Sequence, residues 1–254
     1  MRDFILKPPV VFVTGAGISV ASGLPTFRGP EPDAVWTQDT MEKGTLAYFH
    51  KYPHKQWGWY KDRFSVISDA KPNAAHLVIA QYQERHPDCS IITQNIDGLH
   101  TAAGSQHVIE VHGSWTKVRC TSQSCKLGGR RGGLEVGEDF YSHIKGEGTA
   151  VIGDIPCCPN CRKPLRPHVL WFDESYTSHD SYRYYDALEA IDESETIIFT
   201  GTSFSVGITE KALEMGRWST KKMICIDPYV ETAPRSVELI RGRAEDILLE
   251  LLKE

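Results

Sequence analysis

A short apolar stretch that runs directly into a glycine turn constrains the fold of this chain more than any other feature. Residues 10–13 (Val-Val-Phe-Val) predict a buried strand. The turn that follows reads Thr-Gly-Ala-Gly-Ile-Ser, and its glycines let a diphosphate approach the backbone at the start of a helix. Val20 stands where a complete dinucleotide fingerprint has its third glycine, and a plain strand–turn–helix would look similar. The candidate cofactor-binding residues of this turn are Gly15, Ala16, Gly17 and Ser19.

Further apolar stretches predict a sheet built in the same way. Buried strands are expected at residues 91–92, 108–111, 196–200 and 222–226. Polar or glycine-containing loops follow these stretches, and loops at the carboxyl ends of parallel strands bind nucleotides in open α/β sheets. We therefore expect an α/β fold with a Rossmann-like parallel sheet.

Two of these loops carry side chains suited to chemistry. Gln94, Asn95 and Asp97 offer donors and acceptors together, as a ribose or a carboxamide requires, although a polar loop with helix caps would look the same. His112 ends a predicted strand and is a candidate base because the pKa of histidine lies near the working pH. A lone histidine is, however, more often structural.

A loop rich in glycine and proline lies just past the glycine turn, at residues 22–30. Its Arg28 can pair with a phosphate, and its Phe27 can cover a flat ring. Together with Thr26, these residues extend the candidate cofactor site.

A helical segment rich in aromatic residues places a phenol beside a guanidinium. Tyr60 and Arg63 are three residues apart and share one helix face. Such a pair can bind a carboxylate, with the arginine giving charge-assisted hydrogen bonds. An ordinary exposed helix pair is the alternative.

Four of the seven cysteines form two closely spaced pairs. Cys120 and Cys125 make a C-x4-C pair, and Cys158 and Cys161 make a C-x2-C pair. Two such pairs on separate turns predict one Zn²⁺ held by four thiolates, which is structural because no coordination position stays open. Unrelated thiols are the alternative, and Cys157 can replace Cys158 as a ligand.

Charge and hydropathy argue against several classes of function. The net charge of −5 gives no bulk basic field for nucleic acid. No apolar run reaches the length of a membrane span, and Pro8 and Pro9 interrupt the N-terminal segment too early for a secretory signal. We expect a soluble cytoplasmic protein that acts as a monomer, without nucleic-acid or membrane partners.

Four motifs together resemble one known family. They are Gly-Ala-Gly-Ile-Ser at 15–19, Ser-Gly-Leu-Pro-Thr-Phe-Arg-Gly at 22–29, Thr-Gln-Asn-Ile-Asp-Gly-Leu-His at 93–100 and Val-His-Gly-Ser at 111–114. In this order and at these spacings they resemble the sirtuin (Sir2) family of NAD-dependent protein lysine deacylases. With the C-terminal motifs, the resemblance covers nearly the whole chain.

The resemblance implies a reaction that consumes NAD as a co-substrate. The carbonyl oxygen of an acyl-lysine attacks C1′ of the nicotinamide ribose, and nicotinamide leaves. His112 then accepts a ribose hydroxyl proton, the 2′-oxygen attacks the imidate, and water completes the reaction to lysine and O-acyl-ADP-ribose. Asn95 and Asp97 would act beside His112 by holding the ribose and nicotinamide ends. A mono-ADP-ribosyltransferase or an NAD-hydrolysing sirtuin is the alternative.

The resemblance also implies which residues contact NAD and the acyl-lysine substrate. Residues 165–174 resemble a segment that pairs with the substrate peptide as an added strand, with Trp171 and Phe172 as walls of the acyl-lysine tunnel. The chain departs from the family at Asp173, where glycine is expected, and at residues 206–209 and 227–228. The implied NAD-binding residues are Gly15, Ala16, Gly17, Ser19, Thr26, Phe27, Arg28, Gln94, Asn95, Ile96, Asp97, Gly201, Thr202, Ser203, Asp227 and Ala244.

Within the family, Tyr60 and Arg63 resemble the subclass that removes succinyl, malonyl or glutaryl groups. We therefore expect acylated-lysine proteins or peptides as partners, NAD as the co-substrate and one structural Zn²⁺. The predicted Rossmann-like domain comprises residues 1–35, 72–118 and 166–254. A smaller domain of helices and a zinc ribbon comprises residues 36–71 and 119–165.

Overall fold

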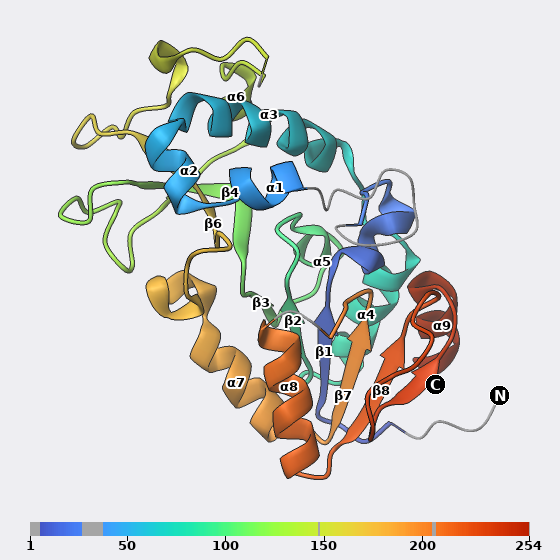
Figure 1. Ribbon diagram of the computed structural model, residues 1–254. Helices are drawn as coiled ribbons and strands as arrows, with labels where there is room; N and C mark the ends of the chain where they lie inside the picture. Colours follow the sequence, from blue (N-terminus) through green and yellow to red (C-terminus); the bar gives the residue numbers. More distant parts are fainter. Residues whose placement is uncertain (1–5, 27–37, 147, 205–206, 254) are drawn as a thin grey trace.

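The larger part of the fold is a six-stranded parallel sheet with strand order β3-β2-β1-β7-β8-β9 (Figure 1). The structure is a computed structural model that describes residues 6–26, 38–146, 148–204 and 207–253. Strand order reverses beside β1, which is where open α/β sheets bind nucleotides, so the predicted Rossmann-like sheet is confirmed. Its strands are β1 (Val10–Thr14), β2 (Ser90–Thr93), β3 (Val108–Glu110), β7 (Thr196–Thr200), β8 (Lys222–Ile226) and β9 (Glu238–Ile240).

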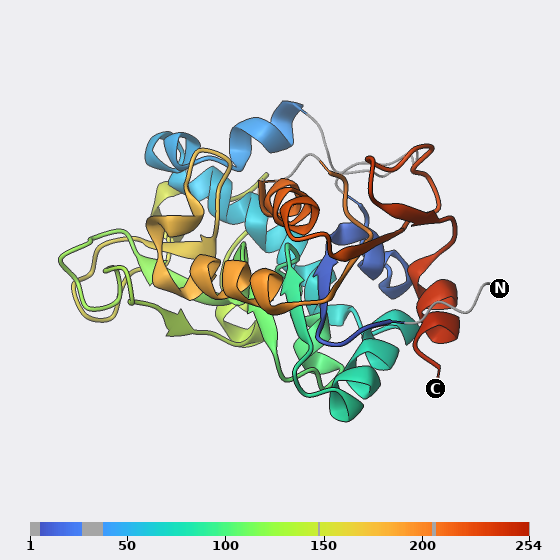
Figure 2. The same ribbon diagram turned by 90° about the horizontal axis from the view of Figure 1, so that it is seen from below.

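Two helical layers cover the opposite faces of this sheet. Successive residues of a strand point to opposite faces, so Val10 and Phe12 enter one core while Val11 and Val13 enter another. The first core is completed by α4 and α9, and the second by α7 and α8 (Figures 1 and 2). These helices are α4 (Ala74–Arg85), α7 (Tyr184–Glu193), α8 (Gly207–Trp218) and α9 (Ala244–Leu251), and a short α5 (Leu99–Ala102) follows β2.

The start of α4 shows how local sequence fixes one of these helices. The side chain of Asn73 accepts a hydrogen bond from the backbone N–H of Ala75 at 2.9 Å. In return, Nδ1 of His76 accepts the backbone N–H of Asn73 at 3.3 Å, which completes a capping box. His76 is fully buried and therefore serves the helix start.

A smaller antiparallel sheet, with strand order β5-β4-β6, lies beyond the carboxyl edge of the large sheet (Figure 1). Its core forms where Trp57 and Phe64 pack against Val118 and Leu165. The strands are β4 (Gly113–Cys120), β5 (Leu134–Glu135) and β6 (Leu165–Val169). The helices around it are α1 (Gln38–Lys43), α2 (Leu46–Lys51), α3 (Pro53–Asp69) and α6 (Glu138–Ser142).

Four short 3-10 helices complete the described segments: η1 (Ala16–Ser22), η2 (Ile152–Asp154), η3 (Tyr176–Ser178) and η4 (Asp180–Tyr182). Across the described ranges, no helix has both the length and the apolar character needed to cross a bilayer. The domain boundaries expected from the sequence stay a prediction. The strands β4 and β6 begin at Gly113 and Leu165 and both belong to the smaller sheet.

Candidate active site

A cavity of about 1200 Å³ opens at the carboxyl edge of the large sheet. Loops that follow β1, β2, β3, β7 and β8 line one side of it, and α3 and the segment after β6 line the other. All of the predicted NAD-binding and substrate residues that the structure describes line this cavity; Phe27 and Arg28 lie outside the described residues. They are Gly15, Ala16, Gly17, Ser19, Thr26, Tyr60, Arg63, Gln94, Asn95, Ile96, Asp97, Trp171, Phe172, Gly201, Thr202, Ser203, Asp227 and Ala244, together with His112.

Two glycine turns touch each other at the bottom of the cavity. The backbone N–H of Gly17 donates to the carbonyl oxygen of Gly201 at 2.9 Å, which joins the loops after β1 and β7. A Cβ on Gly17 would lie 2.6 Å from Cα of Gly201, so no larger residue fits there. Gly201 also has φ +60°, a backbone conformation that favours glycine. The glycines therefore allow the two loops to approach each other closely, and both loops line the cavity.

Asn95, Asp97 and Ser19 form one hydrogen-bonded cluster in the cavity wall. The amide of Asn95 donates to the carbonyl of Gly15 and to the hydroxyl of Ser19, both at 3.1 Å. The Ser19 hydroxyl donates to the Asp97 carboxylate at 2.8 Å. Burial raises the pKa of Asp97, although hydrogen bonds from Leu99 and Ser19 oppose that shift. The cluster therefore holds the amide and the carboxylate in fixed positions between two loops.

The side chain of Gln94 forms hydrogen bonds to other residues of the protein. Its amide nitrogen donates to the hydroxyl of Thr202 at 2.7 Å and to that of Thr209 at 3.1 Å. Its backbone carbonyl faces Nδ1 of His112 at 2.9 Å. A direct contact between Gln94 and NAD thus stays a prediction, while its role in joining β2, α8 and His112 is visible.

His112 lies between two loops with both ring nitrogens engaged. Nδ1 faces the Gln94 carbonyl, and Nε2 lies 3.1 Å from the hydroxyl of Tyr176. Burial lowers the pKa of His112 to about 4, and the hydrogen bond to Gln94 opposes this shift. The imidazole is therefore neutral at pH 7, which is the state that a general base needs.

The predicted acyl-pocket residues come together on the opposite wall. The indole N–H of Trp171 donates to the hydroxyl of Tyr60 at 2.8 Å. The guanidinium of Arg63 lies over the ring of Trp59, 3.6 Å from its centroid. Phe172 is 47% exposed, which places an apolar ring at the cavity's accessible side.

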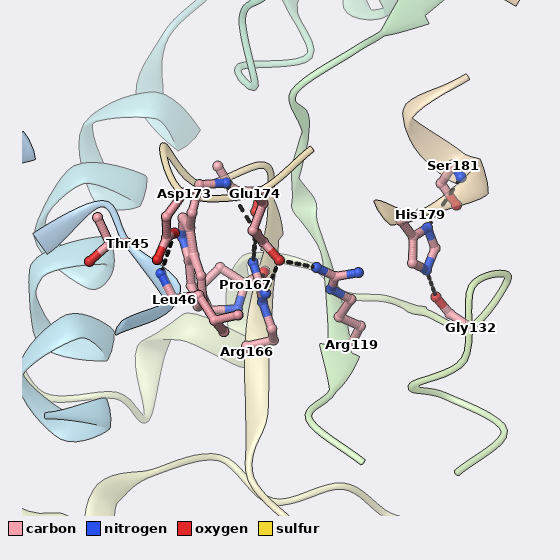
Figure 3. A network of polar contacts seen from close by, with 12 residues as sticks. Thr45, Leu46, Arg119, Gly132, Arg166, Pro167, Asp173, Glu174, His179 and Ser181 are labelled. Atoms are coloured by element: carbon pink, nitrogen blue, oxygen red, sulfur yellow. Dashed lines mark hydrogen bonds and ion pairs between the residues drawn. The ribbon is translucent and has the colours of Figure 1, made fainter. Parts of the chain in front are cut away.

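Asp173, the departure from the family pattern, has a clear local role. Its carboxylate accepts hydrogen bonds from the backbone N–H groups of Leu46 at 2.7 Å and Ala47 at 3.1 Å (Figure 3). These groups belong to the first turn of α2, where backbone donors lack intrahelical partners. The carboxylate therefore ties the end of the predicted peptide-binding segment to α2.

Behind this segment lies a buried group of three charged side chains. Glu174 accepts from Arg166 at 2.7 Å and from Arg119 at 3.0 Å (Figure 3). Burial alone would raise the pKa of Glu174, but the hydrogen bonds and charges of Arg166 and Arg119 hold it below its usual value. Arg166 also lies 3.4 Å from the ring centroid of Trp171, so the charged group supports a side chain that lines the cavity.

The four predicted metal ligands form a separate cluster. Cys120, Cys125, Cys158 and Cys161 bring their sulfur atoms within 4.8 Å of one another. Sulfur atoms at the corners of a zinc–thiolate tetrahedron lie about 3.8 Å apart, so this donor set fits one Zn²⁺ with no open position. Cys157 instead is exposed, and its sulfur faces the carbonyl of Ile155 at 3.6 Å. Cys158, rather than Cys157, is the member of the cluster.

Sequence analysis did not single out Tyr176, although its hydroxyl contacts the candidate base. The two residues are 64 positions apart, and no spacing rule connects them. The available signal was its place just after the predicted peptide-binding segment at residues 165–174.

The fold and the cavity together define a dinucleotide-binding protein of the Rossmann class with an added four-cysteine module. A model of the Sir2 family matches residues 15–207. This chain belongs to the Sir2, or sirtuin, family.

Known relatives span nearly the whole chain. A protein from Leptospira interrogans named NAD-dependent protein deacylase is 33% identical over 100% of this chain and 98% of its own. A Dictyostelium discoideum protein named NAD-dependent deacetylase sir2E is 35% identical over 99% of this chain and 75% of its own. The crystal structure of a Sir2 homologue bound to NAD superposes with a TM-score of 0.76 at 34% identity, covering 96% of this chain and 87% of that one.

Proposed function

We propose that this chain is an NAD-dependent protein lysine deacylase. The observation that carries the proposal is the shared cavity, which a neutral histidine lines together with both glycine turns and the predicted acyl-pocket residues. The names of the relatives support the same activity. NAD is a co-substrate here, and the four cysteines hold Zn²⁺ as a structural element.

The residues of the cavity account for the steps that need a protein group. An acyl-lysine oxygen attacks C1′ of the nicotinamide ribose, and nicotinamide leaves with the bonding electrons. Nε2 of His112 accepts a ribose hydroxyl proton, so that the 2′-oxygen can attack the imidate carbon. Asn95 and Asp97 orient the ribose and nicotinamide ends, because their cluster with Ser19 fixes both side chains. Water then releases lysine and O-acyl-ADP-ribose.

Replacement of His112 by alanine tests this assignment. NAD binding, measured by calorimetry, should persist because the glycine turns and the Asn95 cluster remain. Turnover of an acyl-lysine peptide should disappear because the proposed acceptor of the ribose proton is then absent. The exposed His107 gives a matched control, and His107→Ala should keep full activity. Peptide turnover that survives in His112→Ala would rule out the base assignment.

The preference for dicarboxylic acyl groups is part of the same proposal. Tyr60 and Arg63 both line the cavity, and the charges of Arg166 and Arg63 both act to lower the pKa of the Tyr60 hydroxyl, although burial raises it overall. That positive potential favours an anionic acyl chain. Tyr60 accepts its hydrogen bond from Trp171, so its own O–H can donate to a succinyl carboxylate.

The variant Arg63→Met tests whether Tyr60 and Arg63 bind the acyl chain or only stabilise the structure. It should lower desuccinylation by about 30- to 150-fold, the effect of losing ~2–3 kcal/mol from one charged hydrogen bond, and leave deacetylation nearly unchanged. Lys61→Met removes a cation from the same helix without touching the cavity and should leave both activities intact. A parallel loss of both activities in Arg63→Met would show that the pair is structural only.

The proposal also covers the location and the oligomeric state of the protein. We place the protein in the cytoplasm, where it acts as a monomer on acylated-lysine proteins. Four of the seven cysteines form the metal cluster, and the structure pairs none of the seven in a disulfide.

A further inference from the structure

The hydroxyl of Tyr176 contacts Nε2 of His112, the nitrogen that accepts a proton in the proposed mechanism. Its ring stacks on the imidazole of His112, with centroids 5.6 Å apart and planes 26° from parallel. The same ring also stacks on Tyr184, with centroids 5.2 Å apart and planes 19° from parallel. At the ring edge, a Cβ on Gly207 would lie 3.2 Å from Cε2 of Tyr176. The tyrosine is therefore held on several sides beside His112.

The hydrogen-bond partners assign the protons in this contact. Nδ1 of His112 faces a carbonyl oxygen, that of Gln94, so Nδ1 carries the ring proton and Nε2 presents its lone pair. The backbone N–H of Ile208 donates to the Tyr176 hydroxyl oxygen at 3.3 Å. The phenol proton is thus left to donate to Nε2 across 3.1 Å. A continuous chain of donors runs from the first turn of α8 through Tyr176 and His112 to Gln94.

We infer that Tyr176 is a positioning residue for His112. Its hydroxyl donates to Nε2 and thereby holds the imidazole in one tautomer and one orientation. When NAD enters the cavity, a ribose hydroxyl replaces the tyrosine hydroxyl as the partner of Nε2. The inference rests on the proposed function only in its last step. The contact itself is independent of any activity.

The contact also affects the basicity of His112. A donor on Nε2 stabilises the neutral imidazole, because protonation would replace the lone pair with a second N–H. The titratable group in contact with the ring is Tyr176, and Tyr184 lies behind it. Burial lowers the pKa of this histidine, and the hydrogen bond to the Gln94 carbonyl opposes that shift. Removal of the phenol hydroxyl should therefore raise the pKa of His112.

The test compares Tyr176→Phe with Tyr184→Phe, which each remove one hydroxyl from the same ring stack. NMR titration of His112 should show a rise of about half to one pH unit in Tyr176→Phe, the equivalent of one neutral hydrogen bond. Tyr184→Phe should leave that titration unchanged. In Tyr176→Phe the nitrogen chemical shift of Nε2 should move toward that of an imidazole nitrogen without a hydrogen-bond donor, while Nδ1 keeps its proton because the Gln94 carbonyl remains.

The kinetic readout separates positioning from catalysis. In Tyr176→Phe, the acid limb of kcat/KM for NAD should move to higher pH by the same amount as the NMR titration. An unchanged titration of His112 in Tyr176→Phe, or an equal change in Tyr184→Phe, would overturn the inference. If the titration shifts but neither protein removes acyl groups, the positioning contact stands and the proposed deacylase function fails.

Discussion

The two sheets of this protein are stabilised in different ways. In the large sheet, all residues of β1 and β7 are buried, and apolar side chains fill both faces. The small sheet instead buries Arg119, Arg166 and Glu174, and the four-cysteine cluster lies at its end. Apolar burial is spread over many residues, whereas a charged group or a metal site depends on each member. The small sheet, which carries the predicted peptide-binding segment, should therefore be more sensitive to single substitutions than the large sheet.

Loss of the metal site should have the largest effect. Chelation of zinc, or Cys158→Ser, should remove up to ~10 kcal/mol of stabilisation from the small sheet. Hydrogen exchange should then increase at residues 113–169 but not in β1 and β7. Cys157→Ser, next to it in sequence but outside the cluster, should change neither. Equal exchange in both sheets would show that they unfold as one unit.

Removal of the buried carboxylate should have the second-largest effect on stability. Glu174→Gln leaves two buried guanidinium groups without their anion, so the free energy of unfolding should fall by ~3–5 kcal/mol. Asp180→Asn breaks an exposed pair with Arg130 and Arg131 and should change stability little. Urea denaturation measures both variants, and similar values for the two would contradict the account.

A change at the glycine turns should affect both NAD binding and stability. Gly17→Ala drives a methyl group into Gly201, so it should cost ~1–3 kcal/mol of stability and weaken NAD binding by at least tenfold. Gly153→Ala adds the same methyl group in open space and serves as the control. Calorimetry with NAD checks the first effect, and wild-type affinity in Gly17→Ala would contradict it.

Acid should weaken both sheets gradually, with a separate contribution from each buried histidine. Burial lowers the pKa of His76 to about 4, and burial with nearby cations and His179 lowers that of His168 to about 2. An unfolded histidine takes up a proton near pH 6.5, so between pH 6.5 and these values the unfolded chain binds more protons. Stability should therefore fall as pH decreases, by up to about 1.4 kcal/mol per pH unit for each histidine.

The measurement is urea denaturation at pH 7, 6 and 5. A free energy of unfolding that stays constant or rises from pH 6.5 to 5 would contradict the assignment. His168→Phe should make the decrease shallower, because one of the proton-linked histidines is then absent.

The two sheets also differed in how far the sequence could predict them. The cavity loops were predictable because each follows a buried strand, and a loop's position then follows from the parallel sheet. The contact of His112 with Tyr176 was not, because it joins segments that only the fold brings together. Arg119, Arg166 and Glu174 were missed for another reason: charged residues in a sequence normally indicate a solvated surface. Asp173 stood out as an anomaly, but its bonds to α2 need the position of that helix.

Mass spectrometry of matched acetyl-lysine and succinyl-lysine peptides, with and without NAD, tests the central claim most directly. The account predicts NAD-dependent loss of the acyl group, faster for succinyl, with one nicotinamide released for each acyl group removed. Faster loss of acetyl would keep the deacylase and remove the role of Tyr60 and Arg63. Release of nicotinamide without loss of either acyl group would contradict the account and indicate an ADP-ribosyltransferase or an NAD hydrolase.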